Sequence, residues 1–296
     1  MRLVVTGRQG QVARSLVERA SGTGVEVVTL ERPQLDLAGP AHKIIKALEA
    51  ARPDVIVSAA AYTAVDKAES EPELAFAVNE GGARAVAQAA SRLRVPLIHL
   101  CTDYVFDGSK DVPYVEEDAT GPTGVYGASK LAGEKAVLIE HADCAILRTA
   151  WVYSPFGANF VKTMLRLAAD RDEISVVADQ RGNPTSAIDI AHGILGVARN
   201  LAESSETNLR GIFHMTAAGE ASWAEFAEAI FAASATAGGP TARVRPIRTA
   251  DYPTAATRPA NSRLDSSKLL RSHGVSLPDW HSSLKEVVSR LVRNGA

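Results

Sequence analysis

The first half of the chain alternates short apolar, β-branched runs with longer amphipathic stretches, and this alternation limits the folds available to it. The run at 54–58, Asp-Val-Ile-Val-Ser, is apolar along almost its whole length. Such a run is typical of a parallel strand covered by helices on both faces. Strand–helix repeats with short loops predict an α/β fold with a doubly wound parallel sheet. The predicted strands lie at 2–6, 25–30, 54–58, 96–101 and 145–148.

Composition and charge exclude several other classes of protein. Of the 296 residues, 46% are hydrophobic, and the net charge is −2 without a basic tail or stripe. We therefore expect no nucleic-acid partner and no membrane partner. The apolar runs are too short to span a bilayer, and residues 1–5 form a strand rather than a signal peptide. Cys101 and Cys144 lie in apolar strands, which predicts buried free thiols and a cytoplasmic location.

A glycine-rich turn follows the first predicted strand and leads into a helix, with the spacing G-x-x-G-x-x-A. Glycines let a ligand approach the backbone, and the free amides of a helix N-terminus bind a pyrophosphate. The turn therefore predicts a dinucleotide site, and the alternative is an ordinary tight turn. Small residues after the 54–58 strand would let a flat cofactor lie close. The predicted cofactor contacts in these two segments are Gly7, Arg8, Gln9, Gly10, Gln11, Val12, Ala59, Ala60, Ala61 and Tyr62.

The end of the second strand is where dinucleotide folds distinguish the two nicotinamide cofactors. Glu31 favours a free 2′-hydroxyl and Arg32 favours a 2′-phosphate, with Arg8 as a second cation. We expect NADPH, with NADH possible; the alternative is that all three are solvated surface charges. Asp36 and Leu37 follow, and Asp36 would meet the adenine edge or cap the next helix.

The regular alternation weakens after residue 151. Helices are predicted at 160–169 and 188–201, a sixth strand of the sheet at 174–177, and an edge strand at 243–247, where Pro246 has no N–H to donate. We expect residues 1–150, with 174–212 returning to them, to form a Rossmann domain that binds NAD(P). Residues 151–173 and 213–296 would form a smaller, interleaved substrate-binding domain.

Two segments carry the candidate chemistry. Thr102 and Asp103 end the fourth strand, and ligands of open α/β sheets bind at such strand ends. Tyr126 and Lys130 stand four residues apart, on one face of a predicted helix. A lysine ammonium favours the phenolate, so we expect a lowered tyrosine pKa and a group that transfers protons. Taken alone, the Tyr–Lys pair is a weak signal, and its alternative is an exposed helix pair.

Together these motifs resemble those of the extended short-chain dehydrogenase/reductases, and more closely those of the dTDP-4-dehydrorhamnose reductases. The resemblance covers nearly the whole chain, in order and at family-like spacing. It rests on the motifs at 7–10, 54–61, 62–69, 102–106, 126–134, 148–153, 179–185 and 258–264.

The resemblance implies reduction of the C4 ketone of dTDP-4-dehydro-L-rhamnose to dTDP-L-rhamnose by a nicotinamide cofactor. Tyr126 would protonate the oxygen, helped by Lys130 and Thr102. Arg258 and Arg263 would hold the diphosphate, since guanidinium matches phosphate bidentately. The alternatives are a surface loop for these arginines and a core position for Trp151. The implied substrate contacts are Thr102, Asp103, Tyr126, Trp151, Gln180, Asn183, Arg258, Asn261 and Arg263.

Some relatives form a dimer through magnesium held by glutamates. The aligned positions here are Ser15, Ile188 and Arg290, which supply no carboxylate for an ion that prefers oxygen ligands. We therefore expect no metal site, and a monomer or a metal-independent dimer. Two milder departures are Cys101, where the family commonly has serine, and Ala13, where it usually has a third glycine.

Two alternative functions remain open. The first is another nucleotide-sugar enzyme of the same superfamily: an epimerase, a dehydratase or a reductase of a different 4-keto sugar. Epimerases retain and recycle their cofactor, whereas a reductase releases it at every turnover. The second is a non-catalytic NADP-binding regulatory subunit, like those of methionine adenosyltransferase. The presence of Thr102, Tyr126 and Lys130 argues against the second alternative.

Overall fold

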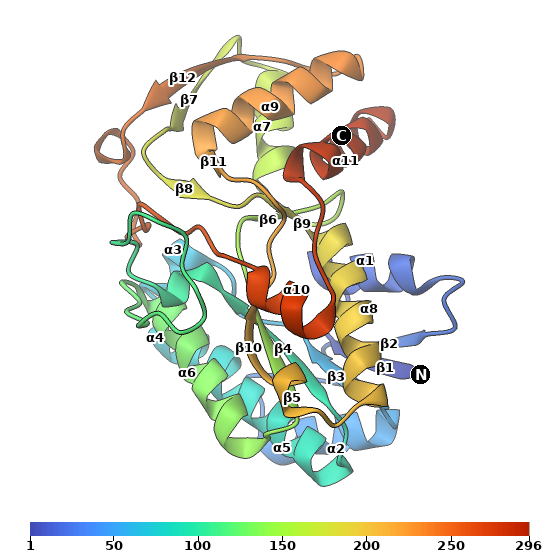
Figure 1. The fold of residues 1–296 in the computed structure, drawn as a ribbon. Helices are drawn as coiled ribbons and strands as arrows, with labels where there is room; N and C mark the ends of the chain where they lie inside the picture. The colour runs from blue at the N-terminus through green and yellow to red at the C-terminus, as the bar shows by residue number, and fades with distance from the viewer. Residues whose placement is uncertain (296) are drawn as a thin grey trace.

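Six strands form the central sheet of the protein, whose computed structural model describes residues 1–295 (Figure 1). The strands run in the order β10-β5-β4-β3-β1-β2, and each neighbouring pair is parallel. This order confirms the predicted doubly wound α/β sheet. The strands are β1 (Arg2–Thr6), β2 (Glu26–Leu30), β3 (Val55–Ser58), β4 (Leu97–Thr102), β5 (Cys144–Thr149) and β10 (Gly211–His214).

Helices cover both faces of this sheet (Figure 1). Successive side chains of a strand point to opposite faces, so Leu3 and Val5 join one apolar core while Val4 joins the other. The first core lies under α1 (Gln11–Ala20) and α8 (Ala187–Glu203). The second lies under α2 (Ala41–Ala51), α5 (Ala83–Leu93) and α6 (Val125–Glu140). No helix within residues 1–295 combines the length and the apolarity that crossing a membrane requires.

The prediction that residues 174–177 add the sixth strand to the central sheet is wrong. Strand β7 (Glu173–Val177) pairs instead with β12 (Arg243–Ile247), and β10 takes the sixth place beside β5. The burial of side chains alternates along β7, as expected for a strand that packs on one side only, whereas β4 and β5 are buried along their whole length. The strand predicted at 243–247 is confirmed.

Most of the remaining elements lie above the carboxyl ends of the central strands (Figure 1). An aromatic cluster that includes Phe160, Trp223 and Phe226 packs α7 (Phe160–Ala168) against α9 (Trp223–Thr236). The division into two domains stays a prediction. The other elements here are β6 (Val152–Tyr153), β8 (Arg181–Gly182), β9 (Thr185–Ser186), β11 (Ala221–Ser222), α11 (Trp280–Arg293) and the 3₁₀ turn η4 (Thr249–Asp251). Two further elements lie elsewhere: α10 (Ser267–His273) packs beside β10, and the 3₁₀ turn η3 (Thr207–Leu209) precedes β10 at the amino ends of the strands.

Residues 72–93 form a continuous helical stretch with a π-helical segment at its centre. It comprises α4 (Pro72–Phe76), η1 (Ala77–Gly82) and α5, and the short α3 (Val65–Ala68) precedes it. Helix α6 packs against η1 so closely that a Cβ added at Gly133 would lie 2.0 Å from the backbone oxygen of Asn79. Both cysteines are buried free thiols, as predicted.

We expect Gly133→Ala to lower the free energy of unfolding by about 1–3 kcal/mol, the usual cost of overpacking. The clash is with backbone, so no side chain can rotate to relieve it. Gly81→Ala is the matched control, because a Cβ at that helical position meets nothing within 4 Å. Urea unfolding of both variants measures the difference. Equal stability of the two would contradict the close packing of α6 on η1.

Candidate active site

The end of β4 and the start of α6 meet at the carboxyl edge of the sheet. The Thr102 hydroxyl donates to Oδ1 of Asp103 at 2.8 Å and accepts from the backbone N–H of Tyr104 at 3.3 Å. These residues open the 3₁₀ turn η2 (Asp103–Val105). A Cβ at Gly127 would lie 2.2 Å from the Tyr104 backbone oxygen, so the glycine lets α6 begin directly against this turn. Thr102 and Tyr126 are thereby brought together.

Tyr126 lies in the first turn of α6, with its ring edge-on to that of Tyr104 at 5.6 Å between centroids. Burial raises the pKa of Tyr126, and the Thr102 hydroxyl partly opposes this rise. The prediction of a lowered tyrosine pKa is therefore wrong for the chain by itself, because desolvation of the phenolate raises the pKa and the neighbouring Asp103 carboxylate raises it further. The hydroxyl keeps its proton at neutral pH.

Lys130 follows one turn later on the same helix and is buried. Its ammonium donates to the backbone oxygen of Leu100 at 2.6 Å. Burial lowers the pKa of Lys130, while Cys101 and the carboxylate of Glu134 act to raise it. Tyr126 and Lys130 therefore lie one turn apart on one helix, as their spacing predicts, and the burial of Lys130 is a further finding of the structure.

Asp103 is 2% exposed, and burial raises its pKa to about 6 although Thr102 and Ser262 act to lower it. Its Oδ2 is buried and has no hydrogen-bond partner among residues 1–295. A buried acceptor without a hydrogen bond destabilises the fold, because it has lost its contact with water, and a ligand that donates a hydrogen bond would remove this cost. A sugar hydroxyl is a donor of this kind.

The glycine turn after β1 fits a dinucleotide. Gly7 has φ +88°, a conformation that favours glycine, and its N–H donates to the Leu30 backbone oxygen at 2.7 Å. The Thr6 hydroxyl accepts the N–H groups of Ala59 and Ala60, each at 3.0 Å, which fixes the end of β3 beside this turn. Helix α1 begins after Gly10 without a side-chain cap, so its first amides are available to a phosphate.

The other residues predicted to contact the cofactor differ in whether their side chains are exposed or already bonded to protein groups. Oε1 of Gln11 accepts from Ser154 and from Asn159, at 2.8 and 2.9 Å, which commits it to the 152–159 segment. Leu37 is buried. Arg8 lies 3.9 Å from Glu31 with 65% of its side chain exposed. The Tyr62 hydroxyl donates a hydrogen bond to Glu71. Gln9, Arg32 and Asp36 are exposed.

The segment after η4 crosses the strand ends and brings Arg258 to the site. Its guanidinium pairs with Asp66 at 2.7 Å, and both charges act on the pKa of Tyr104. Arg263 instead pairs with Glu220 at 3.0 Å. Arg258, unlike Arg263, is therefore close enough to Tyr104 for its charge to act on the pKa of that side chain, which burial raises.

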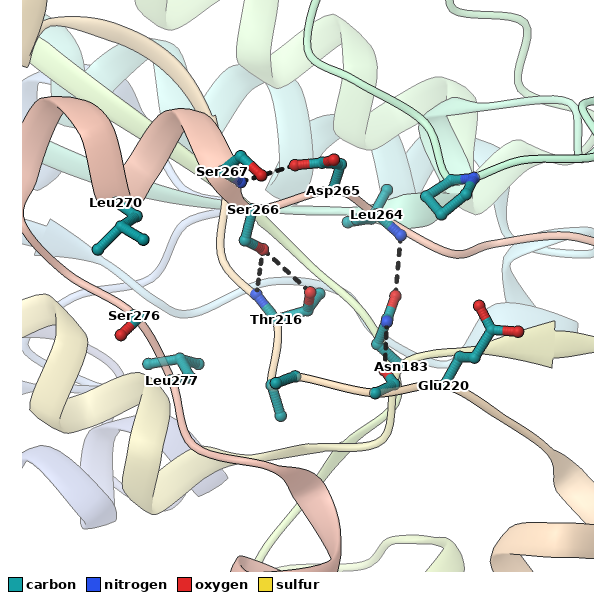
Figure 2. A pocket seen from close by; sticks show the side chains of 14 residues that line it. Asn183, Thr216, Glu220, Leu264, Asp265, Ser266, Ser267, Leu270, Ser276 and Leu277 are labelled. Carbon is teal, nitrogen blue, oxygen red and sulfur yellow. Dashed lines mark hydrogen bonds between the residues drawn. The ribbon is translucent and has the colours of Figure 1, made fainter.

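Asn261, Gln180 and Asn183 hold protein segments together. Asn261 donates to the backbone oxygens of residues 110 and 112 and accepts from Arg263, while Gln180 donates to Thr249. Asn183 bonds the Gly219 oxygen and the Leu264 N–H, and it lines a pocket of about 390 Å³ under α10 (Figure 2). That pocket contains none of the predicted catalytic residues.

Trp151 adopts the left-handed conformation at φ +46° and stacks on Trp223 at 3.5 Å. Its indole N–H donates to Ser262. A Cβ at Gly182 would lie 2.4 Å from the indole, so this glycine admits the ring. The half-buried indole thus packs against protein groups on the sides that Trp223, Gly182 and Ser262 cover, and its contact with substrate stays a prediction.

The comparisons with known proteins agree along the whole chain. The family model described as RmlD substrate binding domain matches residues 1–293. A dTDP-4-dehydrorhamnose reductase from Sinorhizobium fredii is 54% identical over 295 residues, covering 100% of this chain and 99% of its own length.

The chain belongs to the dTDP-4-dehydrorhamnose reductase family. A solved structure of the family from Clostridium acetobutylicum superposes with a TM-score of 0.91 at 36% identity, covering 99% of this chain and 100% of its own. One from Bacillus anthracis, in complex with NADP, has a TM-score of 0.89 at 36% identity, with 97% and 98% covered. The family resemblance read from the motifs is confirmed.

Three polar residues that the sequence left without a role support the site in this family member. Asn79 ties the backbone of Tyr62 to the hydroxyl of Ser129 in α6. Glu69 accepts from the Val125 N–H at 2.9 Å. Asp66 and Glu69 belong to the quoted 62–69 motif, but their partners lie far along the chain, where local patterns give no signal.

The residues at the positions aligned with the metal ligands of some relatives contact other protein groups. Arg290 forms two hydrogen bonds of 2.8 Å to Glu18, and the Ser15 hydroxyl donates to the Gln11 backbone oxygen. Ile188 is buried in the core beneath α8. Within residues 1–295, no cluster of three His, Cys, Asp or Glu side chains is placed to hold a metal. The absence of a metal-linked dimer stays a prediction.

The raised pKa of Asp103 predicts a pH-dependent stability. Its value of about 6 exceeds the ordinary 3.8, so between these values the folded protein binds more protons than the unfolded chain. Stability from this group is therefore present at low pH and lost as pH rises through about 6. Asp103→Asn keeps an acceptor for Thr102 and cannot ionise.

We expect the stability of Asp103→Asn relative to wild type to be greater at about pH 7.5 than at about pH 4, by on the order of 2 kcal/mol. Urea unfolding of both proteins at the two pH values measures this difference. Ionisable groups that titrate alike in the two proteins contribute equally to both stabilities and cancel in the comparison. The same difference at both pH values would contradict the raised pKa.

Proposed function

We propose that the protein reduces the C4 ketone of dTDP-4-dehydro-L-rhamnose to dTDP-L-rhamnose with NADPH. The observation that carries this proposal is the meeting of Thr102, Tyr126 and Lys130 at one strand end, in a chain of the dTDP-4-dehydrorhamnose reductase family. The glycine turn of β1 opens at the same edge of the sheet.

Tyr126 acts as the proton donor. Its raised pKa keeps the hydroxyl protonated at neutral pH, which is the state required to protonate a ketone oxygen as it gains negative charge. The Thr102 hydroxyl holds the same oxygen from the strand side, and Lys130 binds the ribose hydroxyls of the cofactor. When bound, the nicotinamide supplies the hydride.

The dinucleotide lies with its pyrophosphate at Gly7–Gly10 and the N-terminus of α1, beside the small residues 59–61. Arg8, in the turn after β1, and Arg32, just past the end of β2, are both exposed, and there they meet a 2′-phosphate. This arrangement supports NADPH over NADH, since the pairing of Arg8 with Glu31 is long, at 3.9 Å.

The nucleotide sugar lies across the strand ends, with the sugar at Asp103 and the diphosphate at Arg258. The unpartnered Oδ2 of Asp103 supports the contact with the sugar. The charge of Arg258, which acts on the pKa of Tyr104, supports the contact with the diphosphate. The residues after 151 that cover this edge form the substrate-binding domain. Asn183, Asn261 and Arg263 shape the loops of that domain, and Trp151 and Gln180 complete its wall.

The test is the absorbance of reduced nicotinamide with dTDP-4-dehydro-L-rhamnose generated in place by the upstream enzymes. We expect rapid, substrate-dependent oxidation of NADPH, slower oxidation of NADH, and release of the cofactor at every turnover. A protein that binds both ligands without oxidation would be the regulatory subunit. One that retains its cofactor and interconverts isomers would be an epimerase.

Replacing Tyr126 by Phe removes the proton donor and leaves the ring that packs on Tyr104. We expect kcat to fall by roughly two to four orders of magnitude, the scale of general acid catalysis. NADPH affinity and the unfolding transition should stay near wild type, and calorimetry and thermal melts check both. Near-normal turnover would remove Tyr126 from the mechanism.

Replacing Lys130 by Met removes the ammonium and keeps a side chain of similar length. We expect losses in both turnover and NADPH affinity, because the ribose loses its cationic donor. Burial of an ammonium is costly, so the fold should tolerate this change. Titration of the variant with NADPH measures the affinity, and wild-type affinity would contradict the ribose contact.

A further inference from the structure

Glu69 lies at the start of the helix that presents Tyr126. Helix α6 begins after Gly124, which provides no side-chain cap, and its first turn, Val125-Tyr126-Gly127-Ala128, is uncharged. Oε1 of Glu69 accepts the Val125 N–H at 2.9 Å. A Cβ at Gly124 would lie 2.8 Å from the same oxygen, so the carboxylate sits directly over the helix start. Glu69 thus supplies from another segment both the hydrogen bond and the negative charge that stabilise a helix N-terminus.

Asp66 makes the equivalent connection to the segment that carries Arg258. Its Oδ1 accepts the Ala256 N–H at 3.1 Å, and its Oδ2 accepts from the Arg258 guanidinium at 2.7 Å. Arg258 is the less exposed partner, at 19% of its side chain against 48% for Asp66. The carboxylate therefore fixes both the backbone before Arg258 and the direction of its side chain.

Asp66 and Glu69 stand three residues apart, one in α3 and the other at its C-cap. Resting on the function proposed above, we propose that they are positioning residues for the two halves of the reaction. Glu69 sets the place of the proton donor Tyr126, and Asp66 sets the place of Arg258 against the nucleotide diphosphate. One turn of helix thereby fixes the distance between the acid and the anion clamp.

The two residues should therefore act on different kinetic parameters. Displacing Tyr126 harms the chemical step, because a misplacement of about 1 Å can cost roughly 100-fold. Displacing Arg258 harms binding of the nucleotide sugar, while the hydride and proton transfers stay aligned. A carboxylate that only stabilised the fold would instead lower Tm and leave both kcat and the KM values near wild type at temperatures where the variant is fully folded.

The experiment compares Glu69→Ala, Glu69→Gln and Asp66→Ala in the full-length protein with NADPH and the nucleotide sugar. We expect Glu69→Ala to lower kcat about tenfold or more with both KM values near wild type. Glu69→Gln should recover most of this loss, because its amide oxygen still accepts the Val125 N–H. Asp66→Ala should raise KM for the nucleotide sugar about tenfold while kcat and KM for NADPH stay near wild type.

Glu73→Ala is the matched control, since Glu73 is an exposed carboxylate in the next helix, α4. It should leave every parameter near wild type. Unchanged kcat in Glu69→Ala, failure of Glu69→Gln to recover it, or the same kinetic change in both alanine variants would overturn the proposal.

Amide hydrogen exchange separates this proposal from the proposed function. Glu69→Ala should speed exchange at residues 125–128 and leave 254–260 unchanged, and Asp66→Ala should do the reverse. If wild type fails to oxidise NADPH, the proposed reaction is wrong, and the exchange pattern still decides whether the carboxylates hold these segments. Unchanged exchange in both variants would overturn the positioning roles.

Discussion

A buried ion pair fixes helix α6 to the sheet, and the candidate site depends on where that helix lies. Arg148 of β5 donates two hydrogen bonds to Glu134 of α6, at 2.9 and 2.6 Å, with 2% and 3% of the two side chains exposed. Removing either partner would leave an unpaired charge in the core, which typically costs 3–5 kcal/mol. Glu134 lies one turn after Lys130 and two turns after Tyr126. The pair therefore sets the depth and rotation of the face that carries the chemistry.

Many polar side chains around this site form hydrogen bonds to other protein groups and so hold the fold together. Gln11, Asn183 and Asn261 each have donors and acceptors engaged by protein groups, mostly backbone, so loops that cross the strand ends are held without regular secondary structure. Buried polar groups are expected to be paired in this way. The unpartnered Oδ2 of Asp103 departs from that rule, and it lies where a ligand would supply the missing donor. At Asp103 this unused acceptor coincides with the end of β4, next to Thr102.

The sequence predicted well what depends on local pattern and poorly what depends on distant partners. The strands of the sheet follow from β-branched apolar runs, and the glycine turn and the Tyr–Lys spacing follow from neighbouring residues. The place of residues 174–177 was mistaken because strand pairing joins segments far apart, in this case β7 and β12. Arg258 and Arg263 look alike in sequence. They differ because their carboxylate partners, Asp66 and Glu220, come from opposite sides of the site.

The tyrosine pKa shows why local charge reasoning pointed the wrong way. A neighbouring ammonium stabilises a phenolate, but in the reduction proposed above Tyr126 starts as a neutral hydroxyl in a desolvated site, where burial raises its pKa. In that proposal, Lys130 acts at a later step, when the tyrosine gives up its proton and negative charge develops one helical turn away from the ammonium. In low dielectric that stabilisation is worth more than it is in water. The same burial therefore holds the proton on Tyr126 before the transfer and strengthens the attraction that helps to release it during the transfer.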